Sequence, residues 1–205
     1  MRIGQLAIIF GMFFSAAAMA DDCLSYKITP NVDLTVPQWT KQVVQPLQEM
    51  DFLHGNVVAT MVDNYDIVAD ITNIEDGYCV ALKSVNAMVG YSDFLVQIDI
   101  RHAPDTCSYN AILAHEDEHI RAYLSVMDDN RKNLQSAIYN AANSITPIFV
   151  YNQSDIDAAI NELNAELQAH PDLILAKQKI KAAEEIRNKR VDQHDTGESL
   201  RKCFE

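Results

Sequence analysis

Basic residues are scarce in this sequence. Its 205 residues include 16 lysines and arginines against 29 aspartates and glutamates, so the formal net charge is −13 at neutral pH. Nucleic acids and anionic membrane surfaces are bound through clustered lysine and arginine side chains. The charge balance therefore predicts that neither of them is a partner of this protein.

Long apolar runs are also missing, apart from one near the N-terminus. This run covers residues 6–14, follows Arg2, and leads into small residues that end at Ala18-Met19-Ala20. It is shorter than the roughly 20 apolar residues that span a bilayer, and the whole pattern is typical of a secretory signal peptide. We therefore expect residues 1–20 to be cleaved. The remaining chain is then periplasmic or secreted, without stable membrane insertion.

The cysteines form no C-x-x-C pair. This absence argues against zinc binding by thiolates and against thioredoxin-like redox chemistry. All the cysteines lie beyond the predicted signal peptide, and an even number in an oxidising compartment favours disulfides. They are Cys23, Cys79, Cys107 and Cys203. Four cysteines allow three connectivities, and their positions alone leave all three open.

Residues 21–205 have the size of a single domain, and their first part, 21–106, is rich in β-branched and aromatic residues. Strands are predicted there at 56–62, 65–71, 78–82 and 93–100. Turns are predicted at Asp63-Asn64 and at 75–77, and a short helix is predicted at 39–50. These segments predict a mainly antiparallel sheet.

The second part of the domain, 107–205, has helical periodicity. Apolar residues recur near helical spacing from Ser108 onward, and neither glycine nor proline occurs before Pro147, which predicts one long helix. Ser154-Asp155 is typical of a helix N-cap and precedes a second apolar stripe. Pro171 interrupts this stripe, and a charged helix is predicted to continue to about residue 189. A sheet followed by helices is the order of an α+β fold.

The long predicted helix carries an HExxH motif, His115-Glu116-Asp117-Glu118-His119. Residues four apart lie above one another on a helix, so both imidazoles can reach one zinc ion at about 2.0–2.1 Å. Glu116 lies about 100° round the helix, where it can act as general base toward a zinc-bound water. The motif therefore predicts a zinc-dependent hydrolase that acts on a peptide or protein. The alternative is an acidic, solvated helix face whose histidines are incidental.

A catalytic zinc ion needs a third protein ligand, which the motif does not supply. The residues after His119 lack the glycine and histidine of HExxHxxGxxH, which excludes a metzincin. The third ligand should therefore come from later in the chain. The acidic and histidine candidates there are Glu162, Glu166, His194, Asp195 and Glu198.

Two further features could contact a substrate. Tyr123 lies four residues after His119 on the same helix face, where it could donate a hydrogen bond to a developing oxyanion. A tyrosine at this position could equally belong to the core. Residues 94–100 of the last predicted strand could form a sheet edge that pairs with an extended peptide.

A longer run around the motif carries a family resemblance. The run is Cys107-Ser-Tyr-Asn-Ala-Ile-Leu-Ala-His-Glu-Asp-Glu-His119. It resembles a poorly characterised family of exported bacterial proteins that are identified as probable zinc-dependent proteases of zincin type. Some relatives end in Asp-Thr-x-Glu before a last cysteine, which corresponds here to Asp195-Thr196-Gly197-Glu198 and Cys203. Ser199 departs from the aromatic residue expected at its position. The resemblance implies a zincin-like fold and a zinc cofactor.

The resemblance also implies a disulfide pairing and a third zinc ligand. A Cys107–Cys203 disulfide would hold the C-terminal segment near the metal-binding helix, and Cys23–Cys79 would tie the N-terminus to the sheet. Glu198, or alternatively His194, would then come within reach of the metal. On this basis we predict Glu198 as the third ligand. A non-catalytic envelope protein that keeps the zincin fold and the metal is the alternative function.

Overall fold

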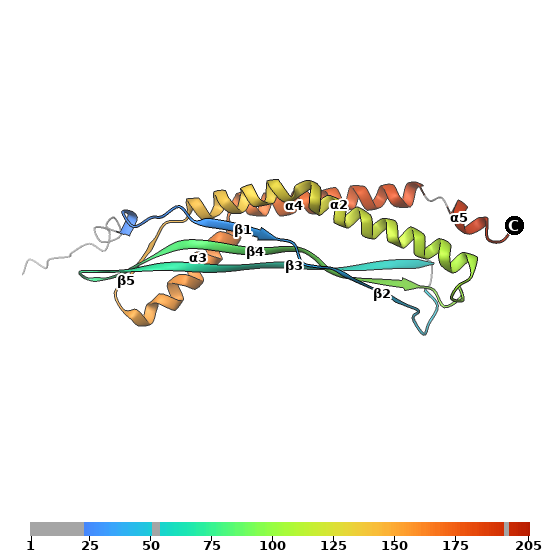
Figure 1. The fold of residues 1–205 in the computed structure, drawn as a ribbon, viewed down its shortest axis with the longest axis horizontal. Coiled ribbons are helices and arrows are strands. Elements are labelled where there is room, and N and C mark those ends of the chain that lie inside the picture. Colours follow the sequence, from blue (N-terminus) through green and yellow to red (C-terminus); the bar gives the residue numbers. More distant parts are fainter. Residues whose placement is uncertain (1–22, 51–53, 195–196) are drawn as a thin grey trace, which may run out of the picture.

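The computed structural model describes residues 23–50, 54–194 and 197–205. The predicted signal peptide and the candidate ligand Asp195 lie outside these residues. The described chain has an α+β fold in which a sheet is followed by helices, as the sequence predicts (Figure 1). No helix in the described part of the chain is long and apolar enough to span a membrane.

The sheet is built around one long strand, β4 (Gly77–Ile98). An almost equally long strand, β3 (Gly55–Ile74), pairs antiparallel with one edge of β4. Three short strands lie one after another along its other edge, namely β5 (Ile148–Val150), β1 (Asn31–Thr35) and β2 (Thr40–Val44). β4 is therefore the central strand, and the possibility that 94–100 forms a sheet edge is wrong, because β2 and β3 pair with this part of β4 on both sides.

The sheet is mixed, which corrects the expectation of a mainly antiparallel sheet. β1 and β2 both run parallel to β4. The chain reverses direction once between β2 and β3 and again in the turn between β3 and β4. After two reversals, β4 runs in the same direction as β2 and pairs with it along the edge that β3 leaves open.

Two local expectations in this region are also wrong. No turn interrupts β3 at Asp63-Asn64, because β4 offers backbone partners along the whole strand, with register shifts at Thr60/Met61 and Val68/Ala69. Residues 40–44 form β2 instead of a helix, because pairing with β4 outweighs their helical spacing. The turn predicted at 75–77 is confirmed, since it joins β3 to β4.

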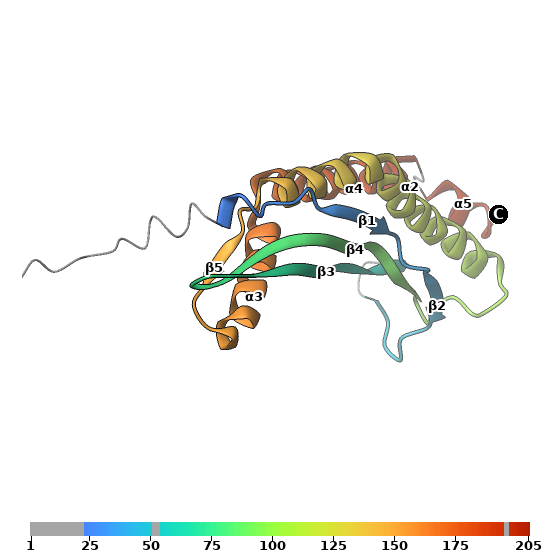
Figure 2. The same ribbon diagram turned by 60° about the vertical axis from the view of Figure 1, so that its left-hand side comes forward.

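The long predicted helix is confirmed as α2 (Cys107–Ser144), which begins after the N-cap Thr106. A 3-10 turn, η1 (Gln153–Asp155), leads into α3 (Ile156–Ala169). The predicted interruption at Pro171 is confirmed, because α3 ends before this residue and α4 (Pro171–His194) begins at it. A short helix, α5 (Glu198–Arg201), follows. α4 packs along α2, and the pair covers one face of the sheet, while α3 lies near the β5 end (Figures 1 and 2).

Two disulfides tie the ends of the described chain to this framework. Cys23 bonds to Cys79 at the start of β4, and Cys107 bonds to Cys203 beyond α5. This is the pairing that the family resemblance implies. The second disulfide fixes the C-terminal segment to the first residue of the helix that carries HExxH.

Candidate metal centre

The two motif histidines lie on the face of α2 that looks toward α4. Their Nε2 atoms are 3.2 Å apart, and each side chain is largely shielded from solvent. The helical spacing therefore brings both imidazoles to one point, as the HExxH motif predicts.

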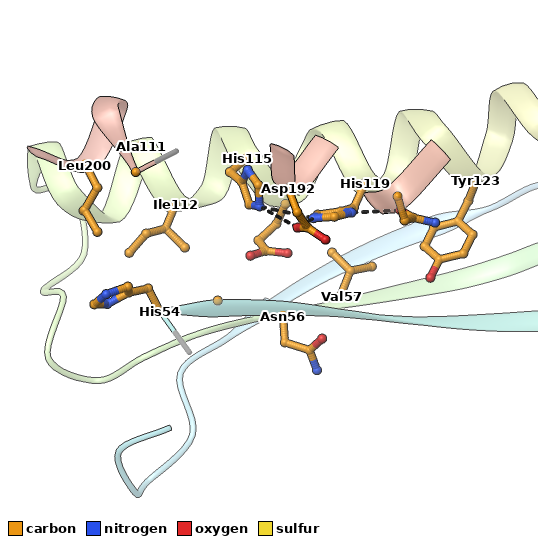
Figure 3. Close-up of a pocket in the computed structure, with 14 residues that line it drawn as sticks. His54, Asn56, Val57, Ala111, Ile112, His115, His119, Tyr123, Asp192 and Leu200 are labelled. Carbon is orange, nitrogen blue, oxygen red and sulfur yellow. Dashed lines mark hydrogen bonds and ion pairs between the residues drawn. The ribbon is translucent and has the colours of Figure 1, made fainter. Parts of the chain in front are cut away.

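The residue that joins them is Asp192, near the end of α4. Its Oδ1 lies 3.1 Å from Nε2 of His119 and 3.6 Å from Nε2 of His115 (Figure 3). The carboxylate is 62% exposed, so the cluster is open to solvent on this side. Among the described residues, this is the group of histidine and acidic side chains whose geometry could hold a metal ion.

The three separations match a tetrahedral zinc site. Zinc bonds of about 2.0–2.1 Å at the tetrahedral angle place ligand atoms about 3.3–3.4 Å apart. Here the corresponding distances are 3.2, 3.1 and 3.6 Å. Two imidazoles and one carboxylate are also the type of donor set that catalytic zinc sites use, with a fourth position left for water or substrate. The residues therefore fit the ion.

Asn188, one turn before Asp192, fixes the tautomer of His119. The amide Nδ2 of Asn188 donates to the backbone oxygen of Glu184 at 3.0 Å, which turns its Oδ1 toward the imidazole. That oxygen lies 2.8 Å from Nδ1 of His119 and must accept a hydrogen bond from it. Nδ1 therefore carries the proton, the arrangement by which proteins orient metal-binding histidines.

This tautomer places a lone pair of His119 Nε2 opposite the Asp192 carboxylate at 3.1 Å. Two electron-rich atoms repel each other at that distance unless a positive charge lies between them. A metal ion between the two atoms would supply this charge and stabilise the arrangement.

Glu184 anchors the part of α4 that carries these residues. The hydroxyl of Tyr91, on the central strand β4, donates a hydrogen bond to the Glu184 carboxylate. Burial raises the pKa of both groups. Glu184, Asn188 and Asp192 are spaced four residues apart, so one face of α4 contacts the sheet, orients His119 and completes the cluster.

Replacing Asn188 with leucine should weaken zinc binding about 10- to 100-fold, because His119 loses the group that orients its ring. Competition with a chromophoric chelator measures this affinity. Gln193→Leu, which removes an amide from an exposed position of the same helix, is the control and should bind zinc like the wild type. Equal affinities for the two variants would contradict the orienting role of Asn188.

Glu116 is the buried acid of the motif. Its side chain is 4% exposed, and burial raises its pKa to about 7, although the charge of His119 acts in the opposite direction. The start of β3 makes room for it, since a Cβ on Gly55 would come within 2.5 Å of the Glu116 carboxylate oxygen. A carboxyl group with a pKa near neutrality can both accept and return a proton.

A cavity of about 470 Å³ opens beside these groups. Its walls come from α2, α4, the first residues of β3 and the C-terminal segment (Figure 3). Tyr123 lines one end, where its ring packs against Tyr91 with centroids 5.1 Å apart. Burial raises the pKa of Tyr123, so its hydroxyl remains a neutral hydrogen-bond donor.

No protein-family model matches the chain, and neither a curated protein nor a solved structure is significantly similar to it. The arguments about its function therefore rest on the motif and on the geometry of the site.

Asp195 is outside the described residues, and the other third-ligand candidates from the sequence do not belong to this cluster. Glu198 is exposed on α5 and pairs with Lys202 at 3.1 Å. Glu162 and Glu166 are exposed on α3, and His194 is exposed at the last position of α4. The structure brings Asp192 to the motif histidines in their place.

A second polar cluster lies where the chain enters α2. His54 lines the cavity, and its Nδ1 lies 3.0 Å from Nε2 of the buried His102. The neighbouring Asp99 is fully buried and accepts hydrogen bonds from the backbone N–H of Met50 and from the side chain of Arg101. These bonds fix the loop that leads from β4 to α2, the helix that carries HExxH.

The hydrogen bonds from the Arg101 guanidinium hold the pKa of Asp99 well below its usual range. The carboxylate therefore stabilises the fold above the unfolded-state pKa of about 3.9, and this contribution is lost as the pH falls toward the lower folded-state value. Asp99→Asn should lower the free energy of unfolding at pH 7, with a smaller difference from the wild type at pH 3. Urea titrations at both values test this, and a difference that grows at pH 3 would contradict it.

Proposed function

We propose that this protein is an exported zinc-dependent hydrolase, specifically a metallopeptidase, whose zinc ligands are His115, His119 and Asp192. The observation that carries this proposal is the meeting of their three ligand atoms, at 3.1–3.6 Å from one another, beside the buried Glu116. The site also opens into a cavity that can receive a substrate.

A zinc ion held by His115, His119 and Asp192 would lower the pKa of a bound water and polarise the scissile carbonyl group. Glu116 accepts a proton from the attacking water and passes it to the leaving amine, for which a pKa near 7 is suited. Asn188 keeps His119 in the tautomer that offers Nε2. Tyr123 offers a neutral hydroxyl at one end of the cavity as a donor to the developing oxyanion.

The proposal includes export and a zincin-like fold. A signal-peptide pattern at 1–20 and two disulfides in the described chain support a periplasmic or secreted protein. A long helix with HExxH that lies over a sheet, with a strand beginning beside Glu116, supports a zincin-like arrangement.

Peptide cleavage by the purified mature protein tests the proposed function. We expect the zinc-loaded protein to hydrolyse members of a quenched fluorescent peptide library. 1,10-Phenanthroline should abolish the activity and added zinc should restore it. Zinc binding without cleavage of any peptide or protein would contradict the peptidase and favour a non-catalytic binding module that retains the metal.

A further inference from the structure

One end of the cavity is built by the C-terminal segment, residues 197–203. Leu200 of α5 lies there with Ala111 and Ile112 of α2, on the opposite side of the motif histidines from Tyr123 (Figure 3). Val57 of β3 lines the cavity farther along, beside His119 (Figure 3). Leu200 is partly buried against the hydrophobic core, so it is a fixed part of this end of the cavity.

The Cys107–Cys203 disulfide explains why Leu200 stays at this position. Cys107 and Ala111 are four residues apart and share a face of α2, while Leu200 is three residues from Cys203. The bond between Cys107 and Cys203 therefore holds Ala111 and Leu200 close together. The disulfide thus holds this segment in place as one side of the cavity.

None of the described residues that line this end of the cavity carries a fixed charge. No lysine or arginine is found among the described residues that line the cavity, and its acidic side chains, Glu116 and Asp192, belong to the metal centre. His54 also lines the cavity and is drawn on the Leu200 side of the motif histidines (Figure 3). A charged substrate group placed here would lose water without gaining an opposite charge, which is costly.

We propose that the Leu200 end of the cavity is a substrate subsite for an uncharged apolar side chain, and that Leu200 sets this preference. The proposal rests on the proposed function, because the substrate must reach the metal centre through the same cavity. It identifies the substrate class as a peptide with an apolar residue next to the cleaved bond.

Binding of peptide hydroxamates to the zinc-loaded Glu116→Gln variant tests this subsite without requiring turnover. The probes carry leucine, alanine or glutamate next to the hydroxamate group, in two series that place this residue on either side of it. In the series that places the variable residue at the Leu200 end of the cavity, we expect the leucine probe to bind at least about 10-fold more tightly than the alanine probe. It should bind about 100-fold more tightly than glutamate, which is charged.

Leu200→Ala should reduce the preference for leucine over alanine, and Leu200→Arg should favour the glutamate probe. Phe204→Arg adds the same charge just after this segment, at a position that is 74% exposed and outside the cavity, so it should keep the wild-type preference. The Cys107→Ser/Cys203→Ser double variant, which releases the segment, should behave like Leu200→Ala.

Equal binding of all probes in both series would overturn the proposed subsite, and so would failure of every probe to bind the zinc-loaded protein. A leucine preference that Leu200 variants leave unchanged would overturn the role of Leu200. A leucine preference without cleavage of any peptide by the wild-type protein would support the subsite while refuting the peptidase, so the two failures are distinguishable.

Discussion

Replacing Glu116 with glutamine should reduce peptide cleavage by about 10²- to 10⁴-fold while leaving the zinc in place. Glutamine has nearly the same shape as glutamate, so the buried position beside Gly55 remains filled. It cannot accept a proton from the attacking water at neutral pH. The zinc affinity should change little in comparison, because Glu116 is not one of the three residues whose atoms form the ligand cluster.

The measurement is kcat/KM with a quenched fluorescent peptide, together with the zinc content of the same samples. Glu118→Gln is the matched control, because Glu118 lies on the same helix turn but is exposed and pairs with Arg121. This control should retain both activity and zinc. Unchanged activity in Glu116→Gln, with zinc bound, would show that another group takes the proton.

Asp192→Ala should weaken zinc binding by more than 100-fold, since the loss of a ligand should exceed the 10- to 100-fold effect of losing an orienting group. Only the two imidazoles would remain from the cluster of three. Chelator competition measures the affinity, and circular dichroism checks that the variant is folded.

Glu198→Ala is the matched control, because it also removes one acidic side chain from the same end of the chain. Glu198 is exposed and paired with Lys202, so its loss should leave the zinc affinity within about threefold of the wild type. The opposite pattern, with zinc lost in Glu198→Ala and retained in Asp192→Ala, would restore Glu198 as the third ligand and contradict the cluster seen here.

Features that depend on local sequence could be predicted here. The long helix α2 follows from apolar spacing without glycine or proline, and HExxH places two imidazoles together on any helix. The turn between β3 and β4 and the break at Pro171 also follow from local residue types. In each case, neighbouring residues decide the structure.

Features that depend on packing between distant segments could not be predicted from the sequence. The parallel pairing of β1 and β2 with β4 depends on the path of the chain, and β3 continues through Asp63-Asn64 because its partner does. Asp192 lies in a helix with many charged residues, and no local sequence pattern distinguishes it from the others. The spacing of Glu184, Asn188 and Asp192 becomes informative only once α4 is known to pack along α2.

The most direct test of the account is the zinc content of the purified mature protein, measured beside the His115→Ala variant. The account predicts about one zinc ion per chain in the wild type and its loss in the folded variant. A folded wild-type protein that takes up no zinc, even after incubation with excess metal, would contradict the account. The motif would then be an acidic helix face whose histidines are incidental.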